Sequence, residues 1–146
     1  MKALSLWQPW AQLIALGHKT IETRSWATVH RGPLLIHAAK RPLDEHARAL
    51  CAALHLHEDM PMGCIVALVD LVDVKPTTHF SGLFGDENGQ KERLLGDYRP
   101  GRYGWCLKLR KRFSFPLFTP GRQRLFEVSP EVLAAHTNEI QRAVTA

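Results

Sequence analysis

The stretch SLWQPWAQLIALGHKTIETRSW, residues 5–26, holds three of the four tryptophans of this chain beside a cluster of charged side chains. It begins inside a short apolar strand that we expect over residues 3–7. Pro9 then opens a helix, because the N–H that proline lacks would be unpaired in a first helical turn anyway. Gly17 is expected to end this helix in the left-handed region. The stretch therefore predicts a strand, a helix and a second strand in close succession.

The second strand is expected over residues 20–26, with Glu22 and Arg24 on the same face. Lys19 stands directly before it, so an ammonium, a carboxylate and a guanidinium gather at one place. Such a cluster can bind a phosphate or a base edge, and a lysine with a perturbed pKa can act as a general base. An exposed array of ion pairs, each worth under ~1 kcal/mol, explains the same spacing. Large rings beside this cluster favour a ligand cleft, with these tryptophans as its walls: Trp7, Trp10 and Trp26.

The length of 146 residues suits one hydrophobic core, so we expect a single domain over residues 1–146. Hydrophobic residues make up 45% of the chain and charged residues 23%, which is ordinary for a soluble globular protein. No run of apolar residues is long enough for a membrane span, and the N-terminus does not resemble a signal peptide. We therefore expect a cytoplasmic location and no membrane partner. The three cysteines lie in apolar contexts and are expected to be buried free thiols.

Charge is distributed unevenly along the chain, which has a formal net charge of +5. Residues 98–126 hold eight Lys or Arg and no acidic residue, whereas residues 42–97 hold ten Asp or Glu against four Lys or Arg. A basic face favours a polyanionic ligand, because basic side chains release the counterions of phosphates. A solvated basic surface that only aids solubility is the alternative.

The remaining elements are short. We expect a helix over residues 43–55 that begins at Pro42, and a terminal helix in which Ser129 is the cap and Pro130 the first residue. Residues 77–98 are expected to form a long loop with one helical turn at 92–95. Further strands are expected over residues 34–37, 63–75, 104–113 and 125–128, the second of them central. Five or six short strands with interspersed helices indicate an α+β fold, a small barrel closed by helices.

A second constellation is YRPGRYGW, residues 98–105. Arginines interleaved with aromatic rings suit single-stranded nucleic acid, because guanidinium groups meet phosphates and rings stack on bases. Arg99, Arg102 and Tyr103 are therefore candidate binding residues, while Trp105 is expected in the core. A third basic cluster, residues 108–112, would contact backbone phosphates or protect a sheet edge.

The histidines predict no metal site, since His55 and His57 have no partner at a familiar ligand spacing. His37 is expected either to line the cleft or to form hydrogen bonds inside the barrel, and we favour the cleft because the basic residues Lys40 and Arg41 follow it. The chain contains no Walker loop, no GxGxxG and no Gly-x-Ser-x-Gly elbow. The sequence therefore does not support nucleotide hydrolysis or serine-hydrolase chemistry. We also expect no cofactor.

These residues resemble the ASCH domain family, named for activating signal cointegrator homology. The family core GxKxxExR matches residues 17–24. The resemblance continues through residues 32–39 (GPLLIHAA), 63–66 (GCIV), 96–105 (GDYRPGRYGW) and 125–128 (LFEV). It implies a PUA-like β-barrel of five to six mainly antiparallel strands with flanking helices, related to the RNA-binding domains of pseudouridine synthases and archaeosine transglycosylases. It further implies nucleic-acid binding in a cleft that contains the GxKxxExR motif.

Some members of this family are hydrolases that remove the acetyl group from 4-acetylcytidine, and others have been assigned ribonuclease activity. The hydrolases carry a lysine that matches Lys19, a threonine three residues later and a distal glutamate. Glu22 occupies the threonine position here, so the hydroxyl nucleophile is missing. Glu87 and Glu92 are the candidates for the distal glutamate.

We therefore predict a nucleic-acid-binding domain, monomeric or weakly associated, with RNA as the first ligand and DNA as the second. Two alternatives stay open: a hydrolase that uses Lys19 and Glu22 as catalytic residues, and a protein-interaction module of the transcription-coactivator type. The predicted binding residues are Trp7, Gln8, Trp10, Lys19, Glu22, Arg24, Trp26, Arg31, His37, Lys40, Arg41, Arg99, Arg102 and Tyr103.

Overall fold

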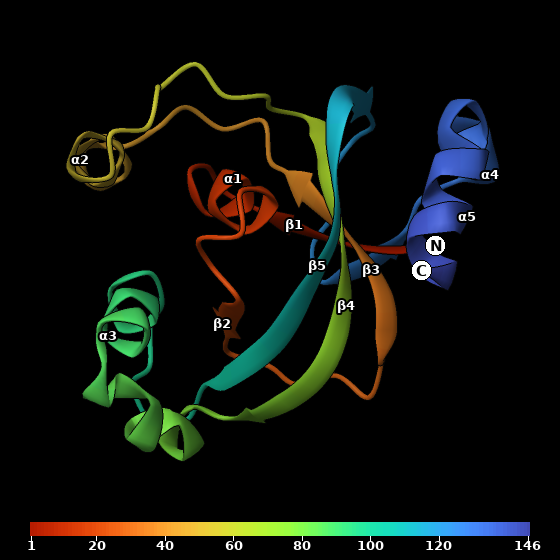
Figure 1. Ribbon diagram of the computed structural model, residues 1–146. Coiled ribbons are helices and arrows are strands. Elements are labelled where there is room, and N and C mark those ends of the chain that lie inside the picture. The colour runs from red at the N-terminus through yellow and green to blue at the C-terminus, as the bar shows by residue number, and fades with distance from the viewer.

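A computed structural model of the chain describes residues 1–146, apart from the side chain of Pro116. Its centre is a mixed sheet in the order β2–β5–β4–β3–β1–β6, which curls into a half-barrel (Figure 1). The predicted α+β class and barrel-like sheet are thus confirmed. The six strands are β1 (Lys2–Leu6), β2 (Ile21–Arg24), β3 (Gly32–Ala38), β4 (Cys64–Pro76), β5 (Tyr103–Phe118) and β6 (Leu125–Glu127).

Strand pairing is antiparallel throughout the sheet except between β1 and β3, which run parallel. This parallel register sets Ser5 opposite His37. On the other side of the sheet, β2 pairs with β5 so that Glu22 lies opposite Trp105. The two registers place side chains from the N-terminal stretch next to residues far along the chain.

Helices cover both faces of the sheet. Helix α1 (Trp10–Ala15) packs inside the curl, and Gly17 follows it with φ +78, as predicted. Three short helical segments pack on the outer face around Ile140 (Figure 1). They are α4 (Pro130–Leu133), η2 (Ala134–His136) and α5 (Thr137–Thr145). Strand β4 is therefore buried on both faces along much of its length, which accounts for its largely apolar sequence and confirms its central place.

Trp105 lies in the core, as predicted, and is fully buried. Its indole N–H donates to the carbonyl of Trp26 at 3.2 Å, and the two rings meet edge to face at 4.8 Å. This contact ties the chain just beyond β2 to β5 and fixes the position of Trp26.

Helix α2 (Glu45–Ala53) begins later than the sequence suggested, so the predicted start at Pro42 is wrong. The carboxylate of Asp44 accepts a hydrogen bond from the N–H of Ala47 at 2.8 Å. This cap satisfies an N–H that has no partner within the helix, and the helix therefore starts after Asp44.

The expected loop over residues 77–98 is largely helical, which corrects the prediction. It contains η1 (Thr77–Gly85) and α3 (Glu87–Leu94), with Asp86 as the cap of the second. Gly89 made this helix hard to predict from the sequence, but the fold requires a glycine at this position. A Cβ at this position would lie 1.6 Å from the carbonyl oxygen of Leu83, so only glycine lets α3 pack this closely on η1.

The three cysteines are free; Cys51 and Cys64 are buried, while Cys106 is half-buried. Among the helices of the part of the chain that the structure describes, none has the length and apolar character needed to cross a membrane.

Candidate nucleic-acid interface

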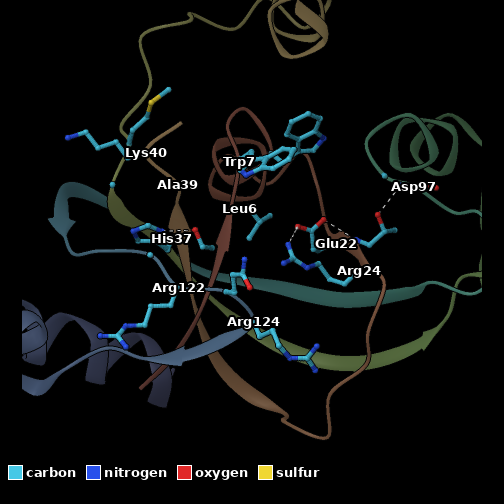
Figure 2. Close-up of a pocket in the computed structure, with 18 of the residues that line it drawn as sticks. Leu6, Trp7, Glu22, Arg24, His37, Ala39, Lys40, Asp97, Arg122 and Arg124 are labelled. Atoms are coloured by element: carbon cyan, nitrogen blue, oxygen red, sulfur yellow. Dashed lines mark hydrogen bonds and ion pairs between the residues drawn. The ribbon is translucent and has the colours of Figure 1, made fainter. Parts of the chain in front are cut away.

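An open cleft of about 1550 Å³ lies on the inner side of the curled sheet. Its walls come from the start of α1, from β2, and from residues 94–97 and 118–124. Figure 2 shows Glu22 and Arg24 toward one end and His37, Lys40 and Arg122 toward the other. The cleft is thus lined by segments from both ends of the chain.

Glu22 and Arg24 line the cleft from the same face of β2, as their alternation predicted. The Arg24 guanidinium lies 3.7 Å from one carboxylate oxygen of Glu22. The other oxygen accepts a hydrogen bond from the N–H of Thr23 at 2.9 Å and lies 3.8 Å from the Lys19 ammonium. The motif therefore forms one charge cluster, with a carboxylate between two cations.

Lys19 lies beneath this cluster and does not line the cleft. Its residue exposure is only 1%, and its ammonium donates to the carbonyls of Ile21 at 2.6 Å and Leu95 at 2.8 Å. Burial lowers the pKa of this ammonium, while the nearby carboxylates of Glu22 and Glu92 act in the opposite direction. The side chain holds β2 against the end of α3 and supports Glu22 from below.

The two arginines of the YRPGRYGW segment are bound to Asp97. Arg99 is exposed outside the cleft and pairs with the Asp97 carboxylate. Arg102 lines the cleft, but it too lies near this carboxylate, at 3.5 Å, and donates to the carbonyls of Asp97 and Thr23. The hydrogen bond from Arg99 is the main reason that the pKa of Asp97 falls to about 2. These arginines therefore contribute less free positive charge than the sequence suggested.

All three predicted tryptophan walls line the cleft. Trp7 is 54% exposed, and the Arg41 guanidinium lies 3.4 Å from the centre of its ring. The Arg124 guanidinium lies over the ring of Trp26, 4.3 Å from the ring centre. Arg124 adopts a left-handed backbone with φ +60, which non-glycine residues adopt only at some energetic cost. Both rings thus have a cation over one face.

His37 lines the cleft floor between Ser5 and Thr119. Its Nε2 lies 2.7 Å from the carbonyl of Thr119 and its Nδ1 lies 2.9 Å from the hydroxyl of Ser5. A carbonyl can only accept, so Nε2 carries the hydrogen and Nδ1 accepts from Ser5. Burial lowers the pKa of His37, which keeps this ring neutral.

Several predicted residues lie outside the cleft lining. Gln8 is buried and donates to the carbonyl of Pro61. Arg31 lies 3.5 Å from Asp73, and Tyr103 pairs with Arg24 across the sheet. The remaining residues outside the lining are Lys19, Arg41, Arg99, Glu87 and Glu92.

The two candidates for a distal glutamate differ in their surroundings. Glu87 is exposed in the first turn of α3. Glu92 is buried, and one oxygen accepts from both the N–H and the hydroxyl of Thr20 at 2.6 Å. Glu92 therefore fastens α3 to the chain just before β2.

The segment TPGRQR, residues 119–124, lines one side of the cleft, although it was not among the predicted site residues. Arg122 and Arg124 come from this segment, and among the described side chains neither forms an ion pair; the same holds for Lys40. A Pro-Gly turn followed by two arginines was a usable signal. Other lining residues that were not predicted from the sequence include Ser5, Thr23, His46, Met62, Asp97 and Phe118.

Comparison with known proteins identifies the family of this chain. The family model described as ASCH domain matches residues 4–114. Activating signal cointegrator 1 from Homo sapiens and from Mus musculus are each 40% identical to this chain in an alignment of 92 positions, which covers 57% of this chain. The match covers only 16% of the length of these relatives. The crystal structure of ASCH from Zymomonas mobilis superposes with a TM-score of 0.60 at 16% identity, covering 94% of this chain and 93% of that one. The chain therefore belongs to the ASCH domain family.

Proposed function

We propose that this chain binds single-stranded RNA in the cleft. One observation carries the proposal: the unpaired cations Lys40, Arg122 and Arg124 line the same open cleft as the exposed ring of Trp7. Basic side chains gain affinity for phosphates by releasing condensed counterions. Aromatic rings stack on unpaired bases, at roughly 1–3 kcal/mol per base.

The size and charge of the cleft support a polyanion. Five basic side chains line it (Arg24, Lys40, Arg102, Arg122 and Arg124) against two carboxylates, those of Glu22 and Asp97. Its volume of about 1550 Å³ exceeds the roughly 300–1,000 Å³ of pockets for drug-sized ligands. There is thus room for more than one nucleotide. The family resemblance makes RNA the first choice and DNA the second.

A hydrolase that uses Lys19 and Glu22 has weaker support. The Lys19 ammonium is buried, and two carbonyls already accept its hydrogen bonds. A group held in this way suits a positioning role better than contact with a substrate. Turnover of acetylated cytidine or RNA that disappears in both Lys19→Ala and Glu22→Ala would favour the hydrolase instead.

Fluorescence anisotropy with a labelled 12-nucleotide RNA tests the proposal between 50 and 200 mM salt. For single strands the slope of log K against log salt is about −0.7 per phosphate neutralised. The double variant Arg122→Gln/Arg124→Gln should therefore bind more weakly and with a slope shallower by about 1.4. Arg142→Gln on α5 is the matched control, because this arginine is exposed and does not line the cleft.

An affinity that is flat with salt and unchanged in the double variant would overturn the proposal. That result would favour the alternative of a protein-interaction module, in which the tryptophan rings of the cleft contact a partner protein.

A further inference from the structure

Glu22 offers hydrogen-bond acceptors to the cleft that the protein itself does not use. A carboxylate has about four acceptor positions, and among the described groups the only hydrogen bond to Glu22 comes from the N–H of Thr23. The contacts with Lys19 and Arg24, at 3.8 and 3.7 Å, are too long to be hydrogen bonds. The side chain is nevertheless only 10% exposed. A ligand that reaches it therefore meets a desolvated carboxylate with free acceptor positions.

Arg24 stands beside this carboxylate as a donor. Its side chain is 25% exposed and lines the cleft, and among the described groups it donates no hydrogen bond to another residue. Acceptors and a donor thus lie next to each other on one wall. This is a pattern that the Watson–Crick edge of a base can complement.

We propose that Glu22 and Arg24 read a guanine base of the bound RNA, which rests on the function proposed above. Guanine presents two adjacent donors, N1–H and the N2 amino group, followed by the acceptor O6. The two oxygens of Glu22 accept from the two donors, and the Arg24 guanidinium donates to O6. Charge-assisted bonds of this kind are stronger than neutral ones.

The other bases fit this pair less well. Uracil has one N–H between two carbonyl oxygens, so one of these oxygens faces the carboxylate. Adenine and cytosine present an amino group beside an unprotonated ring nitrogen, whose lone pair opposes the second carboxylate oxygen. Guanine alone among the four offers two donors side by side on this edge.

The layout of the cleft agrees with this reading. Figure 2 shows Glu22 and Arg24 apart from Lys40 and Arg122, with Leu6 and Trp7 between them in the view. A base at the Glu22 end leaves the sugar–phosphate backbone free to run toward the unpaired cations. The base edge and the phosphates are then recognised by different parts of one cleft.

Inosine provides the sharpest test, because it differs from guanosine only in lacking the N2 amino group. We would compare octamers of uridine that carry one central guanosine or one central inosine, using anisotropy at fixed salt. The wild-type protein should bind the guanosine RNA at least about fivefold more tightly. Glu22→Gln should bring this ratio close to one, whereas Glu131→Gln, at an exposed site on α4, should keep it. Because the ratio is taken within one protein, a loss of folded material cancels.

A second comparison tests Arg24. An octamer with central 2-aminopurine riboside keeps the amino group but lacks both O6 and the N1–H, so the wild-type preference for guanosine over this base includes one contact of Glu22 and the contact of Arg24. Arg24→Met removes only the O6 contact and should therefore reduce this preference without abolishing it. Equal binding of the guanosine and inosine RNAs by the wild-type protein, with a normal salt dependence, would overturn the guanine proposal and leave RNA binding intact. Failure of every RNA in the series to bind would overturn both.

Discussion

The Lys19 ammonium donates to the main-chain carbonyl of Leu95 at 2.8 Å, although 76 positions of sequence separate the two residues. A second bond, to the carbonyl of Ile21, is made at 2.6 Å on the same side chain. The lysine of the family motif thus joins β2 to the end of α3. Together with the bonds from Thr20 to Glu92, this group helps to hold the cleft walls at Glu22 and at residues 94–97 in their relative position.

Lys19→Met should therefore destabilise the fold. Methionine fills the space of the aliphatic stem but leaves two buried carbonyls without a donor, and each such loss costs about 1–3 kcal/mol. We expect the free energy of unfolding in urea to fall by about 2–6 kcal/mol. Lys108→Met, at an exposed site on β5, is the control. Equal stability of the two variants would show that Lys19 has no structural role.

Trp7→Ala should weaken RNA binding while sparing stability. The ring is 54% exposed and lines the cleft, so its loss removes a stacking surface and little of the core. We expect a loss of about 1–3 kcal/mol in binding, measured by anisotropy, with a small change in melting temperature. Trp7→Phe should retain part of the affinity. An unchanged affinity in Trp7→Ala would place the RNA elsewhere.

Local patterns predicted much of the fold. The helix that ends at Gly17, the central strand β4 and the buried Trp105 all follow from periodicity, capping or composition over a few residues. The prediction was wrong for η1 and α3, because Gly89 interrupts the sequence pattern that would have indicated a helix. Glycine usually indicates the end of a helix. At position 89, however, the nearby carbonyl oxygen of Leu83 leaves no room for a larger residue.

The site was predicted less completely, because its decisive contacts are distant in sequence. Glu22 and Arg24 line the cleft as their alternation on a strand indicated. The sequence does not reveal that Lys19 is buried, since its carbonyl partner at Leu95 belongs to another segment. Asp97 lies close to Arg99 in sequence, but only the structure shows that its carboxylate offsets the charges proposed to bind phosphate.

Gly121→Ala should lower RNA affinity through the position of residues 119–124. A Cβ there would lie 2.7 Å from Cε1 of His37 and 3.0 Å from the hydroxyl of Ser5. The histidine is buried and held at both ring nitrogens, so the segment that carries Arg122 must move instead. We expect a severalfold weaker binding constant by anisotropy.

The matched control is Gly82→Ala, because a Cβ at that position meets no atom within 4 Å. It should leave RNA affinity unchanged. If both variants bind like the wild type, the segment tolerates the added methyl group and does not position its arginines rigidly.

The buried imidazole of His37 should make stability depend on pH on the acidic side of neutrality. Its pKa in the folded protein lies below the usual value of 6.5 because burial disfavours the charged ring. Below pH 6.5 the unfolded chain therefore binds a proton that the folded chain does not, and the free energy of unfolding falls as pH decreases, by at most about 1.4 kcal/mol per pH unit for one group. In His37→Gln, which retains a donor for the Thr119 carbonyl, urea denaturation between pH 5 and pH 7 should show a shallower dependence than in wild type. His79→Gln, at an exposed site on η1, should match wild type, and a His37→Gln curve parallel to it would mean that His37 does not titrate differently in the two states.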